Sequence, residues 1–180
     1  TCLSLLPSMK TPSLLLALLS VLFLTGCAEK AAVTYVYEDV TYAFTDESAR
    51  AKFQADREKS LYHRLGGKAA VEAAVDKFYV KVLADKRINH FFEDINMTTQ
   101  HRKQKAFLSA AFGSPVAWKG KDMRRAHEDM TLTEVHFNAV AENLQKTLEE
   151  MKVPQPLIGE VMTIAASTKD AVLNRKPAGK

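Results

Sequence analysis

The sequence predicts an all-α domain that follows a small ββα-like leader. After Gly67, apolar side chains recur at helical spacing in four stretches, and glycine or proline separates the second from the third and the third from the fourth. Before residue 60, apolar side chains alternate with other residues instead, which is the period of a strand. The chain has 180 residues, which is long enough for one ordinary core. Its net charge of +4 is modest.

Two short alternating runs in the leader predict a β-hairpin. Residues 33–37 and 40–44 place apolar side chains at every second position, and Glu38-Asp39 separates the two runs. Thr45 then fits the cap of a short helix that runs towards Arg57, with acidic residues in its first turn. Residues 28–59 therefore form a small segment of their own.

This strand–strand–helix order resembles a YHS-type metal module. That family has cysteines where this chain has Thr45 and Ala49, so the thiolate ligands are missing. A segment of about thirty residues is also a small core by itself. The segment is therefore expected to pack against the following domain or to act as a spacer.

The four helical stretches after Gly67 define the body of the domain. The first starts at Val71 and ends near Asp85, and the second runs from Gln100 to Gly113. The third begins after Thr131 or Thr133, and the fourth runs from about Leu157 to Leu173. Basic and acidic residues are mixed throughout without an aromatic-plus-basic array, which excludes nucleic acid as an expected partner.

A series of motifs in this region carries a specific resemblance. It begins with Leu61-Tyr62-His63-Arg64-Leu65-Gly66-Gly67 and Val75-Asp76-Lys77-Phe78-Tyr79, continues with Phe91-Phe92, Gln100–Leu108 and Ala111-Phe112-Gly113, and ends with Met123-Arg124-Arg125-Ala126-His127. In this order and spacing the motifs resemble a group I truncated haemoglobin. The resemblance implies a two-over-two globin sandwich over residues 60–175, a frayed tail at 176–180, and a haem cofactor.

A single histidine is expected to bind the haem iron. Spacing alone does not choose between His127 and His136, and either reads as an ordinary surface or core histidine. The resemblance assigns His127, because the family places its proximal ligand in this motif; such a ligand needs a neutral imidazole. A histidine that attaches haem covalently elsewhere in the family is replaced near Thr168, which implies non-covalent haem b.

Three polar residues are candidates for the distal side of the haem. The hydroxyl of Tyr79 is placed to donate to bound O₂, and the bland alternative is a core tyrosine. Gln100 and Gln104 share a helical face with apolar residues, and amides are costly to bury without partners. A polar ligand pocket resolves that cost, although solvated glutamines are the ordinary reading.

Lys103 has two open readings. Some members of the family place a residue here that binds iron as a sixth ligand, and burial favours the neutral amine that this needs. The alternative is a lysine that reaches a haem propionate or solvent. An apolar haem wall is also expected, and the residues assigned to it are Phe91, Phe92, Phe107, Leu108, Phe112, Trp118, Met123 and Met130.

The first 27 residues read as an export signal. The run Leu14–Leu24 is apolar but too short to span a bilayer, and Lys10 precedes it. Leu24-Thr25-Gly26-Cys27 resembles the lipobox of bacterial lipoproteins, which implies acylation at Cys27. Residues 1–8 then lie before the natural start. The resemblance implies a lipid anchor in the bacterial cell envelope, on the periplasmic face of the outer membrane.

These observations favour a lipid-anchored haem protein that binds O₂ or NO. Nitric oxide dioxygenation, supported by an unidentified electron donor, is the enzyme activity that fits. The alternative is a haem redox or gas-sensing module in which Lys103 closes the sixth site. A third reading is a haem-free structural lipoprotein.

Overall fold

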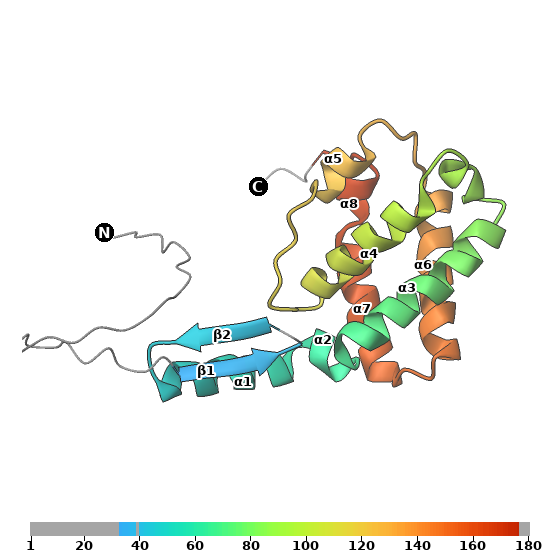
Figure 1. Cartoon of the computed structure of the whole chain (residues 1–180). Coiled ribbons are helices and arrows are strands. Elements are labelled where there is room, and N and C mark those ends of the chain that lie inside the picture. The colour runs from blue at the N-terminus through green and yellow to red at the C-terminus, as the bar shows by residue number, and fades with distance from the viewer. Residues whose placement is uncertain (1–32, 39, 177–180) are drawn as a thin grey trace, which may run out of the picture. The chain divides into compact units, whose positions relative to one another are not determined.

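The computed structural model of the chain describes residues 33–38 and 40–176, and within them it confirms the truncated globin fold (Figure 1). Helices α3 (Gly67–Ala84) and α4 (Met97–Ala111) pack together, and α3 also packs on α6 (Glu134–Glu150), which pairs with α7 (Gln155–Ser167). The shorter elements are α2 (Leu61–Arg64), the 3₁₀ helix η1 (Asn89–Phe92), α5 (Met123–His127) and α8 (Lys169–Val172).

The leader forms the predicted hairpin and helix. Strands β1 (Val33–Tyr37) and β2 (Val40–Phe44) pair antiparallel with Tyr35 opposite Tyr42, and α1 (Glu47–Lys59) follows. Phe53 of α1 lies with its ring centroid 4.8 Å from that of Tyr42, so aromatic contacts hold the helix on the sheet.

The predicted cap of α1 is wrong by one residue. The carboxylate of Asp46, not Thr45, accepts a hydrogen bond of 2.9 Å from the Ala49 amide at the start of the helix. Thr45 instead donates its hydroxyl to Asp46. A carboxylate is favoured here because it also meets the positive end of the helix dipole.

One acidic side chain joins the leader to the globin helices. Glu38, at φ +48° in the hairpin turn, accepts hydrogen bonds of 2.7 Å from the Lys68 amide and from the Tyr62 hydroxyl. Gly67 beside it has φ +66°, which favours glycine, and a Cβ there would lie 2.6 Å from the Glu38 carboxylate, so that side chain would have to move. The Gly-Gly motif therefore serves this junction and the start of α3.

Among the residues that the structure describes, the buried side chains form two clusters. One contains Tyr37 of the leader together with Tyr62, Phe112 and Val161 of the globin helices. The other gathers along α3 around Val75 and extends to η1 and α6. Since Tyr37 belongs to the first cluster, the leader shares the core of the globin domain.

The last predicted helix is interrupted. It was expected to run unbroken to Leu173, but α7 ends at Ser167 and α8 begins at Lys169. The Thr168 hydroxyl donates a 2.7 Å hydrogen bond back to the Ala165 carbonyl, a local bond that competes with the regular helical pattern.

The export signal of residues 1–27, its lipobox and Cys27 lie outside the described residues. Within the described ranges, no helix combines the length and the apolar character that crossing a membrane requires.

Candidate functional site

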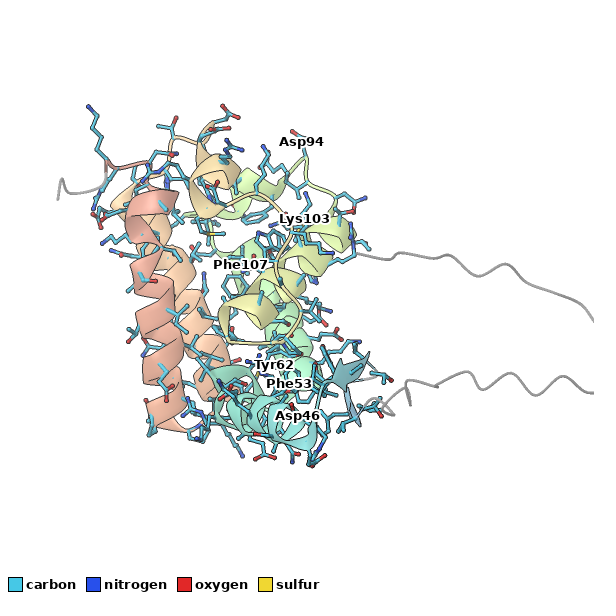
Figure 2. All side chains as sticks on the ribbon, turned by 90° about the vertical axis from the view of Figure 1, so that its left-hand side faces the viewer. Asp46, Phe53, Tyr62, Asp94, Lys103 and Phe107 are labelled. Carbon is cyan, nitrogen blue, oxygen red and sulfur yellow. The ribbon has the colours of Figure 1, made fainter. Side chains whose placement is uncertain are left out.

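A cavity of about 270 Å³ lies inside the helical domain. Its walls come from α3, η1, α4, α5, α6, α7 and α8, and most of the lining side chains are apolar. Figure 2 labels Phe107, one of these residues, on α4. Among the residues assigned to the haem wall from sequence, the structure places seven in the lining: Phe91, Phe92, Phe107, Leu108, Phe112, Met123 and Met130.

The short helix α5 brings His127 to the cavity wall. The Asp122 carboxylate starts the helix by accepting from the Arg125 amide at 2.9 Å. The Nδ1 atom of His127 lies 2.7 Å from the Met123 carbonyl oxygen. Since a carbonyl only accepts, Nδ1 carries a proton, and in the neutral imidazole Nε2 then keeps its lone pair. This is the neutral form that iron coordination needs.

His136 also lines the cavity, but its hydrogen bond gives the opposite result. Its Nδ1 accepts from the Thr133 amide at 3.2 Å at the start of α6. A neutral imidazole whose Nδ1 accepts carries its proton on Nε2, so that atom donates and does not coordinate a metal. The two bonds therefore separate the two histidines that spacing left equivalent, and they favour His127.

Tyr79 is the buried polar residue of α3 at the cavity, with 3% of its surface exposed. The Gln100 amide donates to its hydroxyl oxygen at 3.1 Å, which leaves the hydroxyl proton free for another acceptor. Burial raises the pKa of Tyr79, and the Gln100 bond lowers it by less. The hydroxyl thus stays protonated at neutral pH. Gln104 lines the same cavity.

Sequence reasoning missed a second contact to Tyr79. The His101 ring stacks on the Tyr79 ring with centroids 4.5 Å apart and an interplanar angle of 18°. Asp76 holds His101 through a 2.9 Å contact to Nδ1 and also binds Lys105. The bonds from Lys105 and His101 hold the pKa of Asp76 below its usual range. The available signal was an acidic residue one turn before Tyr79, facing a basic α4.

Two residues assigned to haem contact lie outside the cavity lining. Lys103 is exposed on α4, where Figure 2 labels it. Trp118 packs edge-on against Phe107 with centroids 5.8 Å apart, and its indole nitrogen donates to the Lys121 carbonyl at 2.9 Å. Trp118 therefore packs against a lining residue without lining the cavity itself. Its indole nitrogen is bound within the loop before α5.

With this geometry in place, the comparisons with known proteins identify the class. The model of the bacterial-like globin family matches residues 60–174, and the chain belongs to that family. It is 52% identical over 117 residues to the group 1 truncated haemoglobin LI410 of Chlamydomonas moewusii, covering 64% of this chain and 68% of that protein. It is 49% identical to the group 1 truncated haemoglobin GlbN of Synechocystis, covering 64% of this chain and 98% of that protein.

Solved structures agree with the sequence relatives. The 2/2 haemoglobin of Synechococcus, solved in the cyanomet state with covalently attached haem, superposes with a TM-score of 0.63 at 52% identity, covering 64% of this chain and 99% of that one. The ferric truncated haemoglobin of Tetrahymena pyriformis gives a TM-score of 0.62 at 42% identity, covering 64% and 98%.

Haem is the cofactor of these globins, and the residues present here fit it. The fit rests on three features of the cavity: an apolar lining, a histidine whose Nε2 lone pair is available, and a protonated tyrosine hydroxyl on another wall. Such a haem-based site binds diatomic gases such as O₂ and NO in this family.

Proposed function

We propose that this chain holds non-covalent haem b through His127 and binds O₂ or NO beside Tyr79. The observation that carries the proposal is a pair of hydrogen bonds on two walls of one cavity: the bond to the Met123 carbonyl sets the His127 tautomer, and the bond from Gln100 leaves the Tyr79 hydroxyl as a donor. When bound, haem supplies an iron centre that takes a diatomic ligand and exchanges one electron.

The residues of the chain then divide the work. His127 offers Nε2 to the metal, and its bond to the Met123 carbonyl orients the ring. Tyr79 holds its proton as a donor for the polar end of the ligand, because Gln100 already occupies its oxygen. Gln104 supplies a second amide at the cavity, and the apolar lining excludes water.

We further propose nitric oxide dioxygenation as the reaction. One O₂, one NO and one electron combine to give one nitrate ion, so an electron donor of the cell must act at each turnover. The Tyr79 hydroxyl would stabilise the negative charge that develops on oxygen.

Thr168 supports the non-covalent state of the haem. It lies in the cavity lining, and its hydroxyl donates to the Ala165 carbonyl. The resemblance to the family assigns the attaching histidine of other members to a position near it. The Synechococcus relative, by contrast, has covalently attached haem. Acidic acetone is expected to extract all the haem from this protein.

The proposed location is the bacterial cell envelope, with Cys27 as the lipid anchor on the periplasmic face of the outer membrane. The apolar run before Leu24-Thr25-Gly26-Cys27 supports it. Cells that make the wild-type chain or Cys27→Ala should differ in acyl labelling and in NO removal at the envelope. Equal NO removal would count against an envelope role.

Absorption spectra of the full chain with added hemin test the haem proposal, in the ferric and then the ferrous state. A Soret band that is lost in His127→Ala but kept in His136→Ala supports it. A stable ferrous complex with O₂ supports open gas chemistry, whereas a band unaffected by His127→Ala rejects the assigned ligand.

The rival function is a haem redox or gas-sensing module with Lys103 as the sixth ligand. It requires Lys103 to turn from its exposed position into the cavity. A low-spin ferric spectrum that becomes high-spin in Lys103→Ala would favour this rival.

A further inference from the structure

Helix α5 cannot fix its own position. It has five residues, and irregular chain separates it from α4 on one side and from α6 on the other. A single helical turn has little stability without outside contacts. Those contacts come from α8, which lies beside α5 (Figure 1).

The end of α8 has a defined geometry. The Arg175 amide donates to the Asp170 carbonyl at 2.9 Å, and the Asn174 amide donates to the Ala171 carbonyl at 3.2 Å. This pair of bonds is the Schellman motif, which needs a left-handed residue, and Asn174 has φ +52°. Asparagine tolerates that conformation better than most side chains.

The same residue reaches across to the candidate iron ligand. The Asn174 side-chain amide donates to the His127 carbonyl oxygen at 2.9 Å. In the reverse direction, the Arg124 guanidinium donates to the Arg175 carbonyl at 2.7 Å. Two hydrogen bonds thus run in opposite directions between the end of α8 and α5.

We infer that Asn174 is a positioning residue for His127, an inference that rests on the proposed haem function. The ring of His127 is held by the Met123 carbonyl, and its main chain is held by Asn174. The position of Nε2 relative to the cavity is then set by two bonds, one to the imidazole ring and one to the main-chain carbonyl of His127. Loss of the Asn174 bond frees α5 to shift and weakens the hold of His127 on the metal.

Asn174→Gly isolates that bond, because glycine keeps the left-handed backbone and removes only the side chain. Lys152→Gly is the matched control. Lys152 has φ +57° in a second Schellman motif, in which Val153 bonds to the Leu148 carbonyl at 3.0 Å and Lys152 bonds to the Glu149 carbonyl at 2.9 Å. The Lys152 side chain is exposed and is not in the cavity lining.

The first measurement is haem transfer from the full chain to an excess of apomyoglobin. Asn174→Gly is expected to release haem about fivefold faster than wild type, the effect of losing one net hydrogen bond. The ferrous iron–histidine stretching band should also shift or broaden in this variant. Lys152→Gly should leave both unchanged. Equal haem release and an unchanged band in Asn174→Gly would overturn the inference.

Hydrogen exchange of the haem-free chain separates this inference from the proposed function. The amides of residues 123–127 should exchange faster in Asn174→Gly than in Lys152→Gly, whether or not haem is present. If wild type binds no haem but this difference in exchange appears, Asn174 still holds α5 in place and the proposed haem function fails. If wild type binds haem and no difference appears in exchange, release or band, the positioning role fails.

Discussion

The two polar walls of the cavity are built in different ways. Tyr79 and Gln100 lie within long helices that pack along their length, α3 with 18 residues and α4 with 15. His127 ends a helix of five residues that two hydrogen bonds to the end of α8 hold in place. The groups that would meet the gas thus stand on a rigid frame, whereas the group that would hold the metal depends on a few hydrogen bonds.

The largest expected effect comes from the proximal wall. His127→Gly should lower haem affinity by more than the roughly 10- to 100-fold typical of losing an outer-shell partner, because the ligand itself is removed. Added imidazole should restore much of the Soret band if the vacated space accepts it. Haem titration measures the loss, with His136→Gln as the control. Retained affinity in His127→Gly would contradict the proximal assignment.

The distal wall should respond in a different quantity. Tyr79→Phe keeps the ring and its stacking on His101 but removes the hydroxyl proton. Haem affinity should stay near wild type, while O₂ dissociation measured by stopped flow should rise about 10- to 100-fold, as for losing a hydrogen bond to a charged group. Tyr62→Phe removes the bond to Glu38, which lies outside the cavity lining, and should leave that rate unchanged. An unchanged O₂ dissociation rate in Tyr79→Phe would contradict the assignment of the Tyr79 hydroxyl as the donor to bound O₂.

A smaller effect, on the free energy of unfolding, is expected where the end of α3 is joined to α6. Asp85, just after α3, accepts from the Arg87 guanidinium at 2.8 Å and from the Asn143 amide at 2.9 Å. These bonds, Arg87 first, hold the pKa of the Asp85 carboxyl well below its usual range. Asp85→Ala leaves the buried Asn143 without this partner and should reduce the free energy of unfolding by about 1–3 kcal/mol.

The pH dependence follows from the sign of that shift. A carboxyl with a lowered folded pKa binds fewer protons in the folded state, so its stabilisation is full above its unfolded pKa of about 4. It declines as the pH falls towards the folded value. Urea unfolding between pH 7 and pH 3 should therefore show a shallower loss in Asp85→Asn than in wild type.

The smallest expected effect is that of Lys103→Ala. The side chain is exposed, so stability should change by no more than about 0.5 kcal/mol, as for an ordinary surface position. The ferric absorption spectrum should also be unchanged. A shift from low-spin to high-spin would show that Lys103 binds iron in the wild-type protein. The Tyr79 side of the cavity would then not be more rigid than the His127 side.

Periodicity and motifs predicted the main helices, the hairpin and the residues on the cavity wall. They could not separate Lys103 from its neighbours, because Lys103 lies at the edge of the stripe whose centre faces the cavity. A long charged side chain at such an edge takes the solvent side. His101 and Asn174 escaped prediction for another reason. Their partners lie on other helices or beyond a loop, and a single sequence does not determine how those helices pack against one another.

The Glu38 junction changes what counts as a unit of this protein. The family match begins at residue 60, but the Glu38 carboxylate from the hairpin turn accepts from the Lys68 amide in the first turn of α3, and Tyr37 lies in the globin core. A cut at residue 60 would remove part of the cooperative structure, not a detachable tether. Anyone who transplants this globin onto another scaffold should therefore carry residues 33–59 with it.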